Sequence, residues 1–145
     1  MRGAFSRAAG AALLVGLQGC AAVYTPAAGE ATSTVRNVGF GELRMCRFGK
    51  IYQLPQAKGD PKAVIVPAGQ RITLSAHLRS DGYQVSYHCV PAVSFAPEDG
   101  LLYVANSALS GDGRCGIEVV RDDKASLTGV SIEPSVGPPQ CQVAR

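Results

Sequence analysis

The sequence predicts an all-β fold, a small antiparallel sandwich of two sheets that is stapled by disulfides. Apolar and polar residues alternate with period two in several short segments, and Gly and Pro turn signals separate those segments. After the first 20 residues, no segment has apolar residues at i, i+3, i+4 and i+7 between helix caps. The 17 Gly and 9 Pro in 145 residues are typical of a turn-rich chain, and this length predicts one domain.

The clearest strand signal is the segment 71–79, in which every second residue is apolar and the others are polar. A strand with this pattern has one face on the core and the other in water. The segment 83–89 alternates in the same way, and the turn signal Asp81-Gly82 lies between the two segments. We therefore expect a hairpin whose tip lies within residues 79–82. Its second strand is expected to direct Tyr83, Tyr87 and Cys89 into the core.

Six further segments have the composition of short strands and are separated by turn residues. With the hairpin they make about eight strands, which is typical of a sandwich or a small barrel. We expect the folded domain to cover residues 36–145. The additional strands are expected at residues 42–48, 63–66, 92–95, 101–105, 114–121 and 129–132.

Residues 1–19 are typical of an export signal. Arg2 and Arg7 form a basic head, residues 8–17 are an apolar run, and no acidic residue precedes Glu30. The apolar run is too short to cross a bilayer, which takes about 20 apolar residues in a helix. We expect this segment to be cleaved on export. A plain secretory signal, with Cys20 as an ordinary thiol, is the alternative.

The apolar run ends in Leu17-Gln18-Gly19-Cys20, which resembles the lipobox of bacterial lipoproteins. That family has Leu three residues before the Cys and a small residue directly before it, and Gln18 departs from its usual Ala, Ser or Thr. The resemblance implies cleavage before Cys20, lipidation of Cys20 through a thioether to diacylglycerol, and acylation with fatty acids such as palmitate. Ala21, in place of the Asp that retains such proteins at the inner membrane, implies a lipid anchor in the outer membrane.

Residues 20–35 are expected to be the lipidated cysteine and a flexible tether. Ala, Thr, Gly and Pro dominate this segment without periodicity, so it has little apolar surface to offset its chain entropy. Loss of the signal removes two of the 14 basic residues and none of the 11 acidic ones. The mature chain is then nearly neutral, which argues against nucleic-acid binding. The expected partners are the membrane and an envelope protein.

Four cysteines follow the lipobox: Cys46, Cys89, Cys115 and Cys141. An even number of cysteines in an exported chain indicates two disulfides. Strand phase places Cys89 and Cys115 on apolar faces, which favours their pairing and leaves Cys46 to pair with Cys141. Phase alone does not exclude the other two pairings. The cysteines lack the C-x-x-C spacing of zinc or redox sites, so we expect no metal and no cofactor.

No set of residues in the sequence indicates catalysis, and we expect a protein that is not an enzyme. His77 and His88 lie on the polar faces of the two hairpin strands, without a nucleophile elbow or a third metal ligand. The acidic residues gather in turns without the spacing of a calcium loop. Surface histidines are the expected role of this pair, and an enzyme that uses both of them is the alternative.

The segment from Phe95 to Tyr103, with Pro97 and Gly100 between them, looks like the F-x-P-x-x-G-x-x-Y hairpin of several families of small bacterial lipoproteins. Those families have transthyretin-like or immunoglobulin-like sandwiches. The resemblance implies that fold and an envelope location, and it transfers no catalytic residue. Phe95 and Tyr103 are expected to flank the turn, with Pro97 presetting φ and Gly100 supplying a positive φ.

These observations favour a lipid-anchored envelope protein with a non-catalytic binding or structural role. Loops at residues 53–61 and 106–113 are expected to meet a protein partner, with Tyr24, Tyr52 or Phe40 as candidate anchors. One alternative is a periplasmic inhibitor of an exogenous hydrolase, since Tyr87-His88-Cys89 resembles part of the membrane-bound lysozyme inhibitors. Another is an accessory lipoprotein of a secretion system, since Tyr52-Gln53-Leu54 resembles a strand of type VI secretion lipoproteins.

Overall fold

A computed structural model describes residues 21–141, which form twelve strands and no helix. The proposed signal segment 1–19 and Cys20 lie outside the described residues. The strands are β1 (Ala22–Val23), β2 (Thr32–Asn37), β3 (Glu42–Arg47), β4 (Lys50–Gln53), β5 (Gln56–Ala57), β6 (Asp60–Pro67), β7 (Ile72–Gly82), β8 (Val85–Cys89), β9 (Ala92–Phe95), β10 (Leu102–Leu109), β11 (Cys115–Asp122) and β12 (Val130–Ile132).

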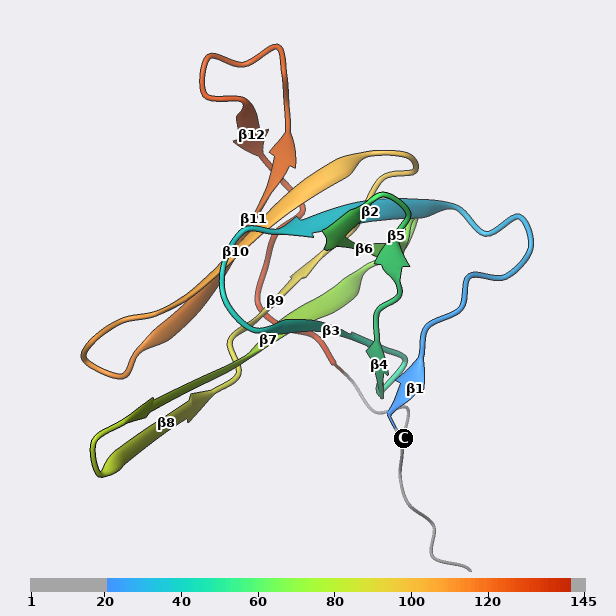
Figure 1. Cartoon of the computed structure of the whole chain (residues 1–145). Helices are drawn as coiled ribbons and strands as arrows, with labels where there is room; N and C mark the ends of the chain where they lie inside the picture. Colours follow the sequence, from blue (N-terminus) through green and yellow to red (C-terminus); the bar gives the residue numbers. More distant parts are fainter. Residues whose placement is uncertain (1–20, 142–145) are drawn as a thin grey trace, which may run out of the picture.

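The strands form two sheets that pack together as a sandwich (Figure 1). In the first sheet the order is β1-β4-β3-β7-β8, and β9 pairs with the half of β7 that β8 leaves free. In the second sheet the order is β12-β11-β10-β2-β6-β5. The predicted all-β sandwich is confirmed. Both sheets are mixed rather than purely antiparallel, because β1 runs parallel to β4 and β2 runs parallel to β10.

The core lies between the two sheets. Its largest side chains are Phe95 and Tyr103, which are fully buried and meet edge to face with ring centroids 5.2 Å apart. Aliphatic side chains from both sheets surround these rings, as the alternation in the sequence predicts. They include Val35, Leu43, Met45, Val66, Ile72, Leu74, Leu78, Val93 and Val119.

The segment from Phe95 to Tyr103 joins the two sheets, so the expected hairpin is wrong. β9 pairs with β7 in the first sheet, whereas β10 pairs with β2 and β11 in the second. Gly100 has the predicted positive φ, 71°, and Pro97 is buried. The Glu98 amide donates to the Tyr103 hydroxyl at 2.9 Å. The chain crosses between the sheets here because this path buries both aromatic rings in the shared core.

Residues 21–35 do not form a flexible tether, which corrects the expected domain boundary at residue 36. β1 pairs with β4, and Tyr24 directly after it is buried. β2 lies inside the second sheet between β6 and β10. The apolar pattern of β2 is weak because one of its buried positions is Ser33, whose hydroxyl donates to the Glu98 carbonyl. The folded domain therefore begins close to Ala22.

The hairpin of β7 and β8 is present, but its tip is Tyr83-Gln84 instead of Asp81-Gly82, because Gly82 pairs with Val85. The side chains of Tyr83, Val85 and Tyr87 are exposed, although the alternation predicts a buried face. This part of the hairpin extends beyond the sandwich (Figure 1), where there is no core to receive them.

The disulfide between Cys46 and Cys141 belongs to the body of the sandwich, with the two Cα atoms 5.6 Å apart. It fixes the Pro-rich C-terminal segment to β3. Two backbone hydrogen bonds between Ser94 and Gly137, at 3.0 and 2.8 Å, attach the same segment to β9. The C-terminal segment is thereby held against the first sheet.

Candidate functional site

Two hairpins project from one end of the sandwich (Figure 1). We call them the arms. The first arm is residues 78–89 of β7 and β8, and the second is residues 107–117 of β10 and β11. A disulfide between Cys89 and Cys115 joins them, with the two Cα atoms 6.6 Å apart. An isolated two-stranded ribbon is only marginally stable, so this bond stabilises the arrangement of both arms.

The pairing of Cys89 with Cys115, like that of Cys46 with Cys141, is the one that strand phase favours. Cys89 and Cys115 are partly buried and pack against the edge of the core. Alternation therefore placed both sulfurs on the correct face.

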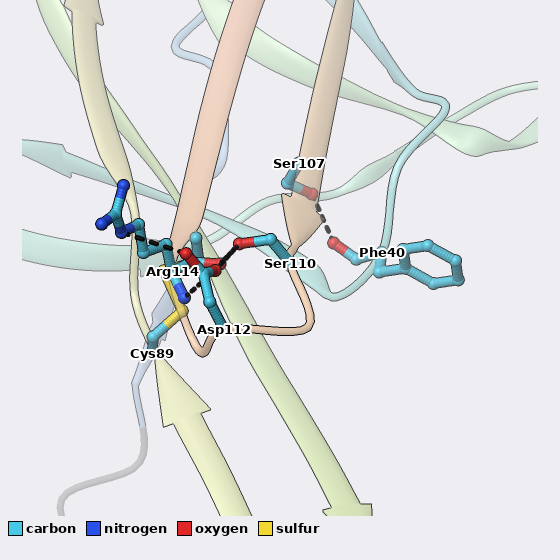
Figure 2. Close-up of a disulfide and its surroundings, with 7 residues drawn as sticks. Phe40, Cys89, Ser107, Ser110, Asp112 and Arg114 are labelled. Atoms are coloured by element: carbon cyan, nitrogen blue, oxygen red, sulfur yellow. Dashed lines mark hydrogen bonds and ion pairs between the residues drawn. A yellow bond between two sulfur atoms is a disulfide. The ribbon is translucent and has the colours of Figure 1, made fainter.

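The tip of the second arm is a compact turn held by hydrogen bonds to Asp112 (Figure 2). The Asp112 carboxylate accepts from the Ser110 hydroxyl at 2.5 Å and from the Arg114 amide at 3.2 Å. These hydrogen bonds lower the pKa of Asp112. Gly113 has a φ of 81°, and a Cβ there would lie 3.3 Å from Cε1 of Tyr87. The Tyr87 ring of the first arm thus packs against the turn of the second.

A cleft of about 550 Å³ lies where the first arm leaves the body. β3 pairs with β7 only as far as the pair Glu42 and His77, so this edge of β7 is open from Leu78 onward. The cleft occupies this open position beside the base of the second arm. Its lining residues are Phe40, Gly41, His77, Leu78, Arg79, Ser80 and Leu109.

The open edge of β7 presents unpaired backbone groups. The Ala76 amide donates to the Pro91 carbonyl, so it points toward the side of β8 and β9. Successive residues of a strand alternate their hydrogen-bonding direction, so Arg79 and Asp81 direct their N–H and C=O groups toward the β3 side. No strand of the described chain pairs with them there. Such an edge is a template for an added strand.

The Phe40 ring is 75% exposed, yet its backbone is held firmly. The Phe40 amide donates to the Ser107 carbonyl at 3.0 Å, and the Ser107 hydroxyl donates to the Phe40 carbonyl at 2.5 Å (Figure 2). The loop and β10 lie so close that a Cβ on Gly39 would overlap the backbone of Ser107. A large aromatic side chain on a fixed backbone is the kind of group that anchors protein interfaces.

His77 and His88 come together at the base of the first arm, with ring centroids 6.5 Å apart. Burial and the neighbouring Arg44 guanidinium lower the pKa of His77, against the opposing effect of Glu42. Within residues 21–141 there is no cluster of three His, Cys, Asp or Glu residues that could hold a metal ion. His77 lines the cleft, where its imidazole can form hydrogen bonds.

The predicted contact loops are largely strands. Residues 53–61 contain β5 and the turn into β6, and residues 106–113 are the end of β10 with the tip of the second arm. Of the candidate anchors, Phe40 is exposed at the cleft and Tyr24 is buried. Burial and the nearby Glu30 carboxylate raise the pKa of Tyr24 to about 12.

The alternation in the sequence predicted that His77 and His88 come together, but no feature of the sequence indicated that the edge of β7 is open.

No protein-family model, curated protein or solved structure matches this chain. In the described part of the chain, no helix has the length and apolarity needed to cross a membrane.

Proposed function

We propose that the protein is a lipid-anchored outer-membrane protein that binds a protein partner through its arms and has no catalytic role. The lipobox-like segment Leu17-Gln18-Gly19-Cys20 supports the anchoring. The observation that carries the binding role is the cleft beside the open edge of β7, with the fixed and exposed Phe40 at its rim.

The exposed side chains of the arms favour a protein partner. Tyr83 at the tip of the first arm is 92% exposed, and Val85 and Tyr87 are exposed on the same strand pair. Aromatic residues are enriched in the energetically dominant parts of protein interfaces. The charged residues of the arms are paired internally, because Arg79 contacts Asp81 and Arg114 contacts Asp112. The arms therefore offer apolar and backbone contacts without a strong net charge.

The geometry favours β-strand addition as the binding mode. An extended segment of the partner would pair with the N–H and C=O groups of Arg79 and Asp81, which have no partner strand within the described chain. An apolar side chain of that segment would enter the cleft between Phe40 and Leu109. Main-chain hydrogen bonds would supply affinity, and the cleft would select the side chain.

Site-specific photo-crosslinking in intact cells tests this proposal. A photoreactive residue is placed at Phe40, at Tyr83, or at Leu127, which is fully exposed on the loop between β11 and β12. We expect the same adduct from positions 40 and 83 and none from position 127. Adducts from all three positions in equal amount, or from 127 alone, contradict a partner site on the arms.

A proline substitution tests strand addition itself. Because the Arg79 N–H points to the open edge, Arg79→Pro removes a donor for the partner without removing a hydrogen bond to β8. We expect Arg79→Pro to abolish the adduct and Arg79→Ala to retain it. Equal adduct yields from the two variants, with unchanged circular dichroism, contradict pairing at this edge.

Inhibition of a hydrolase is a second candidate, favoured by the shape of the first arm. It is a narrow projecting hairpin with Tyr83 at its tip, braced by the disulfide at Cys89. A hairpin of this shape can enter the active-site cleft of an enzyme. Activity assays of a lysozyme panel with micromolar protein decide between the candidates: inhibition that Tyr83→Ala removes supports this one, and unchanged activity eliminates it.

A further inference from the structure

A second exposed apolar cluster lies at the opposite end of the first sheet from the arms. We call this cluster the basal tip: Val23 of β1, Phe48 in the turn between β3 and β4, and Ile51 of β4. These side chains are 57, 75 and 53% exposed. Lys50, between the turn and Ile51, is also exposed, and its ammonium group lies 5.4 Å from the centre of the Tyr52 ring, on the other face of β4 from Ile51. The basal tip is thus an apolar surface with a cation at its margin.

The direction of β1 places the start of the described chain at the basal tip. β1 runs parallel to β4, with Ala22 opposite Tyr52 and Val23 opposite Gln53. The same register places Ala21 beside Ile51, directly after the turn. Cys20 precedes Ala21 in the chain, and one residue spans at most about 3.6 Å. Lipid attached to Cys20 would therefore join the protein next to these exposed side chains.

The turn at the basal tip holds Phe48 outward at a conformational cost. Arg47 pairs with Lys50, so Phe48 and Gly49 form a two-residue loop, and their φ angles are 51° and 73°. Positive φ at both positions is the type I′ geometry, for which Asn-Gly is the favoured sequence. A bulky side chain with positive φ is uncommon, because its Cβ is crowded against the backbone in this conformation. The folded chain keeps this ring exposed, where it contributes little to the core.

We infer that the basal tip rests on the surface of the lipid bilayer. The inference depends on the proposed acylation of Cys20, because the acyl chains bring the tip to the membrane. Phe48, Val23 and Ile51 enter the boundary between headgroups and acyl chains, a depth of about 5–10 Å at which aromatic and apolar side chains are stabilised. The Lys50 ammonium reaches the lipid phosphates while its methylene stem stays among apolar groups.

This placement orients the arms away from the membrane. Cys46, next to the basal tip, pairs with Thr73 near the start of β7, and the first arm ends after Gly82. The 11 residues of β7, at about 3.3 Å each, separate the two ends of the sheet by roughly 35 Å. The arms therefore face outward from the bilayer, where a partner protein has access to the cleft.

Single-tryptophan fluorescence tests the inference, since the chain contains no Trp. Phe48→Trp and Tyr83→Trp each introduce one reporter into the full chain, which is purified with its natural modifications. Each protein is placed in vesicles of phosphatidylethanolamine and phosphatidylglycerol with brominated acyl chains, which quench tryptophan at the depth of the acyl boundary. We expect strong quenching at position 48 and none at position 83. Ile51→Trp repeats the measurement in a strand, in case the strained turn rejects Trp.

Mass spectrometry of the same samples separates this inference from the proposed anchoring. If Cys20 is acylated and positions 48 and 51 are quenched no more than position 83, contact of the basal tip with the bilayer is wrong and the lipid anchor stands. Equal quenching at all three positions contradicts the outward orientation of the arms. A chain without acyl groups overturns the anchoring and the inference together.

Discussion

The first half of β7 and strand β8 have the same alternation of apolar and polar residues but different surroundings. In the first half, Leu74 and Leu78 are buried between the sheets. In β8, Val85 and Tyr87 are exposed, because this strand lies in the first arm. Alternation therefore predicts a strand wherever it occurs, but burial needs a facing sheet. The body of the sandwich is stabilised by its core, whereas the arms depend on turns and on the disulfide between Cys89 and Cys115.

The largest expected difference is between two phenylalanines, one in the core of the body and one at the rim of the cleft. Phe95→Ala removes a fully buried ring, so we expect the free energy of unfolding to fall by about 3–5 kcal/mol. Phe40→Ala removes an exposed ring and should change it by less than about 0.5 kcal/mol. Denaturation followed by circular dichroism measures both values. Similar values for the two variants would contradict the division between a stabilising core and a recognising cleft.

The body also contains an ion pair with a buried carboxylate, whereas the ion pairs of the arms are exposed. The Glu133 carboxylate is fully buried and accepts from Nε of Arg121 at 2.5 Å and from the Ser135 hydroxyl at 2.5 Å. Removing one partner of a buried pair is costly, so we expect Glu133→Gln to lower stability by about 3 kcal/mol at pH 7. The matched exposed substitution is Asp81→Asn in the first arm, whose expected effect is much smaller because water surrounds both partners of this ion pair.

The same carboxylate gives a pH dependence with a defined sign. Burial raises the pKa of Glu133, but the hydrogen bonds from Arg121 and Ser135 outweigh it, and the pKa lies below its ordinary value of 4.5. A depressed carboxyl pKa stabilises the fold above pH 4.5, and this contribution is lost as the pH falls through the folded pKa. Glu133→Gln should therefore flatten the loss of stability in acid. An unchanged acid profile would show that the pair does not hold the body together.

Two glycines in the turn of the second arm differ in their backbone conformation and in the space around them, so a smaller difference in stability is expected between their variants. Gly113 has a φ of 81° and faces the Tyr87 ring, whereas Gly111 has open space around its Cα. We expect Gly113→Ala to lower the free energy of unfolding by about 1–2 kcal/mol and Gly111→Ala to leave it nearly unchanged. Thermal unfolding of both variants measures this difference. Equal effects would mean that the two arms do not pack on each other at this turn.

The smallest expected effect is at His77, where the first arm joins the body. Burial and the Arg44 guanidinium lower its pKa, Glu42 raises it and His88 lowers it, with a net decrease. Protonation is thus disfavoured in the folded state, and stability falls as the pH drops below the ordinary value of 6.5 toward the folded pKa. His77→Asn should reduce the slope of stability between pH 7 and pH 5. Parallel slopes for the variant and the parent would contradict this assignment.

Local patterns in the sequence predicted most of the body. The alternation from Ile72 to Leu78 marks buried positions of β7, and the phase of Cys89 and Cys115 favours the disulfide that forms. The two-residue strand β1 has too few residues for a periodic pattern. The parallel partners of β1 and β2 are distant in the chain, so no turn signal announces them.

The position of the turn at the tip of the first arm depends on contacts with residues that are distant in the chain. A turn at Asp81-Gly82 would place Cys89 opposite Leu74. The register found places Cys89 opposite Leu78, which leaves the beginning of β7 free to pair with β9 and brings Cys89 to Cys115. The chain accepts Gln84 with a φ of 63° in return. Turn preferences depend only on neighbouring residues, so they do not predict these long-range contacts. The open edge of β7 and its cleft depend on the same contacts and were therefore not predicted.

The central claim, a domain fixed to the membrane by lipid at Cys20, is tested most directly by the mass and the first residue of the mature protein. Intact mass spectrometry of the chain purified from its own envelope should show residues 1–19 removed, and Cys20 carrying a diacylglycerol thioether with an acylated amino group. A chain that retains residues 1–19 and has an unmodified Cys20 thiol would contradict the account.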